Sequence, residues 1–169
     1  MINLTQKNRS LEWYVDWIAQ YDFEVFATLR LNDSIPLSNA AKIFRNEVLL
    51  PICRSSPHND IGAIIITSPG HPGLQRRHAH AAVATRNRDV SERIDELIKT
   101  LAHPENIAVR GSKALDIRPY RRFDDVDAEG KARPGHPRYM AGHLTGPEDL
   151  SVYGKEFLKT INRSLTHGN

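Results

Sequence analysis

The chain has one cysteine, two methionines and no apolar run that approaches the length of a membrane span. Cys53 cannot form an intrachain disulfide, so the cysteine content gives no argument for export. The first residues also lack the basic and then apolar pattern of a secretory signal. We therefore expect a cytoplasmic protein that has no membrane partner.

The sequence also lacks internal repeats, low-complexity linkers and a Gly-x-x-x-x-Gly-Lys-Ser/Thr loop. The missing loop removes the usual signature of a nucleotide-hydrolysing motor. What remains is ordinary globular composition, with 40% apolar and 25% charged residues. A length of 169 residues suits one domain with a sizeable hydrophobic core, and we expect residues 1–169 to form a single domain.

Positive charge is modest in sum but clustered along the chain. The net charge is +3, and arginines and lysines gather around residues 76–88 and 113–122. Clustered bases can form a phosphate-binding face, although solvated strand ends and loops would give the same pattern. The residues that we assign to nucleic-acid binding are Arg76, Arg77, Arg118, Arg121, Arg122 and Arg138.

Helical and strand patterns alternate through the first half of the sequence. Residues 10–20 and 36–50 place apolar side chains at helical spacing, and residues 23–31 alternate in the manner of a strand. The β-branched run 61–67 and the segment 76–85 flank a turn rich in proline and glycine, which predicts a hairpin.

The second half adds a helix, short strands and a loop before two final helices. The order of elements predicts an α+β fold in which helices pack on a central antiparallel sheet of about five strands. The expected elements are a helix at 89–101, strands at 107–109 and 114–120, a loop at 123–135, and helices at 137–144 and 147–162.

The strongest local motif is the pair of histidines in His78-Ala79-His80. Two residues spaced by two on a strand point to the same face, so both imidazoles can reach one metal ion, while Ala79 points into a core. Imidazole is a common ligand for divalent transition metals. Two histidines on a half-exposed strand can also be polar surface residues that bind nothing. The mid-strand position and the adjacent arginines favour the metal site.

A metal site needs more ligands than this pair, and the sequence does not single out the third. His71 lies in the hairpin turn and is the further ligand that we assign. Acidic alternatives are Glu24, Asp60 and Asp116, whose proximity depends on the order of strands in the sheet.

A second motif, Pro137-Arg138-Tyr139-Met-Ala-Gly142-His143, combines a tyrosine and a histidine. At a spacing of four, Tyr139 and His143 share one face of a helix. A tyrosine near a metal can attack a phosphodiester and hold the cleaved strand covalently, with nearby bases offsetting the charge that develops. A half-buried core tyrosine would give the same local pattern. We assign Tyr139 and His143 to catalysis.

These motifs together resemble the HUH endonuclease superfamily. Phe26-Ala-Thr-Leu is similar to its hydrophobic first motif, His78-Ala-His80 to its histidine motif, and Tyr139 to its nucleophile motif. The tyrosine follows the histidines, which is the order in rolling-circle replication initiators, and the resemblance covers residues 21–145. It implies the HUH/Rep-like fold, a ferredoxin-related sandwich.

The resemblance implies an endonuclease and strand transferase that nicks single-stranded or hairpin DNA to initiate rolling-circle replication of a plasmid or virus. It implies Mg²⁺ or Mn²⁺ as cofactor, a 5′-phosphotyrosine intermediate on Tyr139, and a separate helicase and polymerase as partners. The protein would then act in the host compartment where its replicon resides. The family usually has lysine three residues after the tyrosine, where this chain has Gly142. His143 and Arg138 are the candidates for the missing positive charge.

Two other functions fit parts of the same pattern. A catalytically inactive domain on this fold would bind an origin hairpin without cutting it. A cyclic phosphoesterase with two His-x-Thr/Ser motifs would need no metal; His143-Leu-Thr145 fits that motif, whereas His78-Ala-His80 lacks the hydroxyl. Within the endonuclease hypothesis, Tyr153 is a rival nucleophile and Tyr120 is a candidate for stacking on a DNA base.

Overall fold

The computed structural model describes residues 4–32, 35–50, 61–70, 77–85, 115–126, 129–130 and 132–162. The helix expected at 89–101 and the strand expected at 107–109 lie outside these residues. His71 and Arg76, two residues with assigned roles, also lie outside them.

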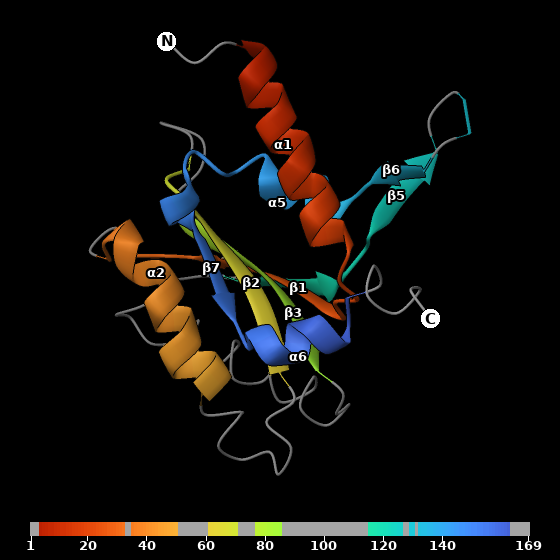
Figure 1. The fold of residues 1–169 in the computed structure, drawn as a ribbon. Coiled ribbons are helices and arrows are strands. Elements are labelled where there is room, and N and C mark those ends of the chain that lie inside the picture. Colours follow the sequence, from red (N-terminus) through yellow and green to blue (C-terminus); the bar gives the residue numbers. More distant parts are fainter. Residues whose placement is uncertain are drawn as a thin grey trace.

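Five antiparallel strands form the central sheet, in the order β4-β1-β3-β2-β7 (Figure 1). The central strand β3 (His78–Thr85) lies between β1 (Val25–Arg30) and β2 (Ile61–Ser68), and the edge strands are β4 (Leu115–Pro119) and β7 (Leu150–Tyr153). The predicted hairpin corresponds to β2 and β3, which pair along their full lengths. The prediction of an α+β fold built on a five-stranded antiparallel sheet is confirmed.

Helices cover both faces of this sheet (Figure 1). α1 (Leu4–Ala19), α5 (His136–Ala141) and α6 (Lys155–Thr160) pack on one face. α2 (Leu37–Phe44), which continues as a π-helical turn (Arg45–Leu49), packs on the other. None of the described helices combines the length and the apolar character needed to cross a bilayer.

Alternation along the strands divides the core into two layers. Ala79 and Ala81 of β3 pack toward α2, whereas Ala82 packs toward α1, α5 and α6. Every residue of β2 and β3 is buried, as expected for strands that are covered on both faces. The prediction that Ala79 points into a core is therefore confirmed, and His80 faces the side of the sheet that carries α5.

The loop predicted at 123–135 is instead a short hairpin outside the main sheet. β5 (Phe123–Val126) pairs with β6 (Ala132–Pro134), and between them Gly130 has a left-handed backbone with φ of 77°. Acidic, proline and glycine residues dominate this segment, so no apolar alternation marks its strands in the sequence. The hairpin leads directly into α5.

The single helix predicted at 147–162 is also wrong. Pro147–Asp149 forms one 3₁₀ turn, β7 then pairs with β2, and only Lys155–Thr160 is helical. Gly154, between β7 and α6, has φ of 64°, and a Cβ atom there would clash with the carbonyl oxygen of Ile61. Pairing with a strand distant in sequence therefore overrides the local helical pattern.

Candidate metal and nucleophile site

Three histidines meet above the α5 face of the sheet. His78 and His80 come from β3, and His143 follows the end of α5. The ring centroids lie 4.6 Å apart for His78 and His80, 5.1 Å for His78 and His143, and 4.5 Å for His80 and His143. One ligand nitrogen from each ring lies within 4.8 Å of the other two, so the three imidazoles could hold one ion.

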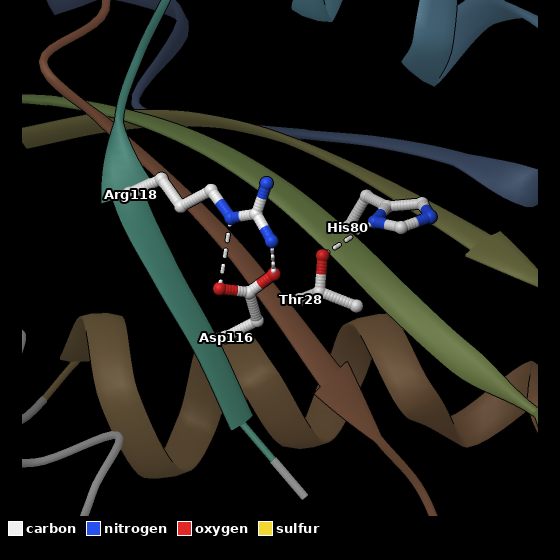
Figure 2. A network of polar contacts seen from close by, with 4 residues as sticks. All are labelled: Thr28, His80, Asp116 and Arg118. Carbon is white, nitrogen blue, oxygen red and sulfur yellow. Dashed lines mark hydrogen bonds and ion pairs between the residues drawn. The ribbon is translucent and has the colours of Figure 1, made fainter. Parts of the chain in front are cut away.

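His80 is the best-defined member of this group. Its side chain is fully buried, and its Nδ1 atom lies 2.9 Å from the Thr28 hydroxyl oxygen (Figure 2). With a proton on Nδ1 donated to Thr28, the lone pair of Nε2 is available as a ligand. Nε2 is itself buried and has no hydrogen-bond partner among the described residues. A buried nitrogen of this kind fits a metal ligand, since an unpaired polar atom is costly.

Burial keeps this site in the neutral form that metal binding needs. Burial, together with the charges of His78, His143, His136 and Arg30, lowers the pKa of His80 to about 2. Burial also lowers the pKa of His143, and the charge of His78 acts in the same direction. His80 and His143 therefore present uncharged nitrogens near neutral pH.

Hydrogen bonds fix the position of His143 in the loop that follows α5. Its Nδ1 atom lies 3.2 Å from the Ser68 hydroxyl oxygen at the end of β2. Two residues further on, the amide and hydroxyl of Thr145 donate to the buried carboxylate of Asp149, and the amide of Gly146 donates to the same carboxylate at 3.1 Å. The hydroxyl of Thr145 is thus engaged in the loop, which gives no support to a His-x-Thr phosphoesterase site.

Tyr139 lies beside this histidine group on α5. Its ring centroid is 4.9 Å from that of His80 and 4.8 Å from that of His143, and its side chain is 48% exposed. It also makes an edge contact with Phe26 at 5.9 Å. The tyrosine therefore combines proximity to the candidate metal ligands with access from solvent, as a nucleophile that attacks a polymeric substrate requires.

The rival tyrosines lie in different settings. Tyr153 on β7 packs against the core layer on the α2 side, which is the opposite face of the sheet from His80. Tyr120 packs against Phe23 and His136, with ring centroids 5.2 and 5.4 Å apart, and its hydroxyl oxygen is buried. Of the three tyrosines, Tyr139 alone contacts the histidine group in the described part of the chain.

The arginines assigned to nucleic-acid binding differ in their partners. Arg138 donates to both carboxylate oxygens of Glu12 at 2.8 and 3.0 Å, which joins α5 to α1. Arg77 donates to the carbonyl oxygen of Ile35 at 3.3 Å. Arg121 is exposed in the segment between β4 and β5, and Arg118 is exposed on β4, where it pairs with Asp116.

Arg122 and the acidic candidates for a third ligand can also be placed. The Arg122 guanidinium lies over the Phe123 ring, 5.2 Å from its centroid. Asp116 lies on the α5 face of the sheet, but it is paired with an arginine and does not belong to the histidine group. Burial raises the pKa of Glu24, which also lies apart from that group. Asp60 lies outside the described residues.

His136 is a residue near the site that the sequence analysis did not select. Its ring stacks on Phe26 with centroids 4.1 Å apart, and its Nδ1 atom accepts a hydrogen bond of 2.8 Å from the backbone amide of Arg121. Phe26 in turn stacks on His80 at 5.5 Å. The position of His136 at the first residue of a helix after glycine gave no signal of this packing.

The setting of His80 and His136 predicts a pH-dependent stability. Burial lowers the pKa of both imidazoles below the ordinary value of 6.5. The unfolded chain therefore binds more protons than the folded chain as the pH falls below about 6.5, so the free energy of unfolding decreases on acidification. Urea unfolding in the presence of a chelator, between pH 7.5 and 5, measures this slope. His136→Phe keeps the stacked ring without the titration and should flatten the slope; an unchanged slope would contradict the assignment.

No protein-family model matches the chain, and neither a curated protein nor a solved structure does.

Proposed function

We propose that the protein is a metal-dependent single-stranded DNA endonuclease whose nucleophile is Tyr139. The observation that supports this most is the contact of the half-exposed Tyr139 ring with two of three convergent imidazoles. A tyrosine that served only to fill the core would not be 48% exposed. Two histidines without a function on a strand would also not explain the approach of a third histidine from another element. A metal site and a phenol side by side suit transesterification of a phosphodiester.

The donor set suits a divalent cation. Three neutral imidazoles leave positions open for oxygen ligands from water and from a DNA phosphate. Nitrogen ligands favour Mn²⁺ over Mg²⁺, and Mn²⁺ also accepts phosphate oxygen, so we propose Mn²⁺ as the working ion and Mg²⁺ as the weaker alternative. When bound, such an ion would polarise the scissile phosphate and offset its charge.

The proposed reaction exchanges one phosphodiester for another. The Tyr139 hydroxyl oxygen forms a bond to phosphorus while the bond from phosphorus to the 3′ oxygen breaks. The phenolic proton leaves to solvent, and the departing 3′ oxygen takes up a proton. The products are a 5′-phosphotyrosine link and a free 3′-hydroxyl that a polymerase can extend. The link conserves the phosphodiester energy, so rejoining needs no nucleotide hydrolysis.

This chemistry suits the initiation of rolling-circle replication of a plasmid or virus. The nick supplies a primer end, and the covalent link keeps the other end available for closure. A separate helicase and polymerase are the proposed partners, since the sequence has no nucleotide-binding loop.

The test is covalent capture of a single-stranded oligonucleotide pool that has a randomised central region. With Mn²⁺ and a label at the 3′ end, the label should stay on the protein through denaturing electrophoresis, and EDTA should prevent the transfer. The same pool labelled at its 5′ end should give shortened DNA and no labelled protein. DNA binding without any adduct would reject the endonuclease and support the inactive DNA-binding domain.

A further inference from the structure

A salt-bridged arginine lies on the same face of the sheet as the candidate site. In the strand register, Arg118 on β4 is opposite Phe26, and Asp116 is opposite Thr28. Thr28 is in turn opposite His80. Residues opposite one another in antiparallel strands share a face, so Asp116, Thr28 and His80 form a row across β4, β1 and β3 (Figure 2).

The guanidinium of Arg118 is oriented by this row yet open to solvent. Its Nε donates to one carboxylate oxygen of Asp116 at 3.0 Å, and Nη2 lies 2.7 Å from the other oxygen. Two parallel contacts fix the plane of the guanidinium, and within the described part of the chain its remaining N–H groups have no hydrogen-bond partner. The Arg118 side chain is 55% exposed, and Figure 2 shows it extending over β1 on the side where Thr28 and His80 lie.

The same arginine lies on the sheet beside a residue that contacts Tyr139. The hydrogen bond and the charge of Asp116 raise the pKa of Arg118, and the charge of Tyr139 adds to that effect. Phe26 is opposite Arg118 in the sheet, and its ring contacts the ring of Tyr139. A guanidinium within electrostatic range of the phenol is placed to meet charge that develops during attack.

Arg138 and His143, the two residues that the sequence offered as a positive charge beside the nucleophile, are less suited to that task. Arg138, the residue before Tyr139, is held toward α1 by the carboxylate of Glu12, whereas Asp116 holds Arg118 over the sheet face that carries His80. His143 belongs to the histidine group, and an imidazole that binds a metal ion does so in its neutral form, so it does not supply a fixed positive charge. Three residues after Tyr139 stands Gly142, which has no side chain.

We propose that Arg118, oriented by Asp116, contacts the phosphate that is transferred to Tyr139 and stabilises the negative charge that builds on its non-bridging oxygens. The inference rests on the proposed endonuclease function and adds a catalytic residue to it. Planar N–H groups match two phosphate oxygens, and a contact that strengthens as charge develops accelerates the chemical step more than it tightens binding.

The test is single-turnover adduct formation on the 3′-labelled oligonucleotide pool in Mn²⁺, at saturating DNA. Arg118→Gln should slow adduct formation about 100-fold and change DNA affinity only a few-fold, as expected when one donor to the transition state is lost. Arg118→Lys keeps the charge without the planar donors and should recover only part of the rate. Lys159→Gln removes one exposed charge from α6 and should leave the rate unchanged.

The outcomes separate this inference from the function on which it rests. If the wild-type protein forms no adduct, the endonuclease itself fails. If the wild type forms the adduct and Arg118→Gln forms it at the same saturating rate, the enzyme stands and Arg118 is only a DNA contact or a surface residue. The side chain is exposed, so thermal melts of the Arg118 variants should match the wild type and exclude a folding defect.

Discussion

Replacing His78 and His80 together with alanine should abolish the binding of Mn²⁺. The two residues supply two of the three convergent nitrogens, and residues that merely orient a metal ligand already change affinity by 10 to 100-fold when removed. We therefore expect affinity to fall by at least about 100-fold. Isothermal titration calorimetry with MnCl₂ on the wild type and on the double variant measures this change.

Two further variants show whether the loss of Mn²⁺ binding comes from the missing ligands and not from an unfolded protein. His143→Ala removes the third, half-buried imidazole from a loop outside the sheet and should weaken Mn²⁺ binding strongly. Thr28→Val keeps the shape of its side chain but removes the hydroxyl beside His80, and should weaken binding by about 10 to 100-fold. Equal heats of binding in the wild type and in all folded variants would contradict the metal site.

Replacing Tyr139 with phenylalanine should abolish the covalent DNA adduct, with a loss of at least about 1,000-fold, because the nucleophilic oxygen is removed. The phenyl ring can keep the contacts with His80 and His143, so the binding of Mn²⁺ and of DNA should remain nearly intact. Single-turnover transfer of a 3′-labelled oligonucleotide measures the first effect, and calorimetry and fluorescence anisotropy measure the others.

Tyr153→Phe is the matched control for this variant. Tyr153 lies on the opposite face of the sheet from the histidine group, so its hydroxyl should not affect adduct formation. Loss of the adduct in Tyr153→Phe together with its survival in Tyr139→Phe would overturn the assignment of the nucleophile while leaving the reaction class in place.

The features that the sequence predicted best depend on residues close together in the chain. The alternation along β3 and the turn before it predicted a hairpin with His78 and His80 on one face and Ala79 in a core. The spacing of four between Tyr139 and His143 likewise predicted that their side chains lie together, and their rings are 4.8 Å apart. The helix predicted at 137–144 was too long, since α5 ends at Ala141 and His143 follows it.

The features that it did not predict depend on how distant segments pack. His143 approaches His78 and His80 only because α5 lies across the sheet, and the chain between β3 and α5 does not encode that placement locally. The row of Asp116, Thr28 and His80 requires β4 and β1 to be neighbours, which the order of elements leaves open. β7 was missed because an edge strand of four residues carries little periodicity of its own.

Mass spectrometry of the adduct tests the central claim most directly. Trypsin cleaves after Arg138 and Lys155, so Tyr139 and Tyr153 fall in one peptide, 139–155, and fragmentation must locate the attached nucleotide within it. After reaction of the wild type with the oligonucleotide pool in Mn²⁺ and nuclease trimming, we predict a nucleotide joined through its 5′ phosphate to Tyr139. A nucleotide on another residue, or no modified peptide at all, would contradict the account.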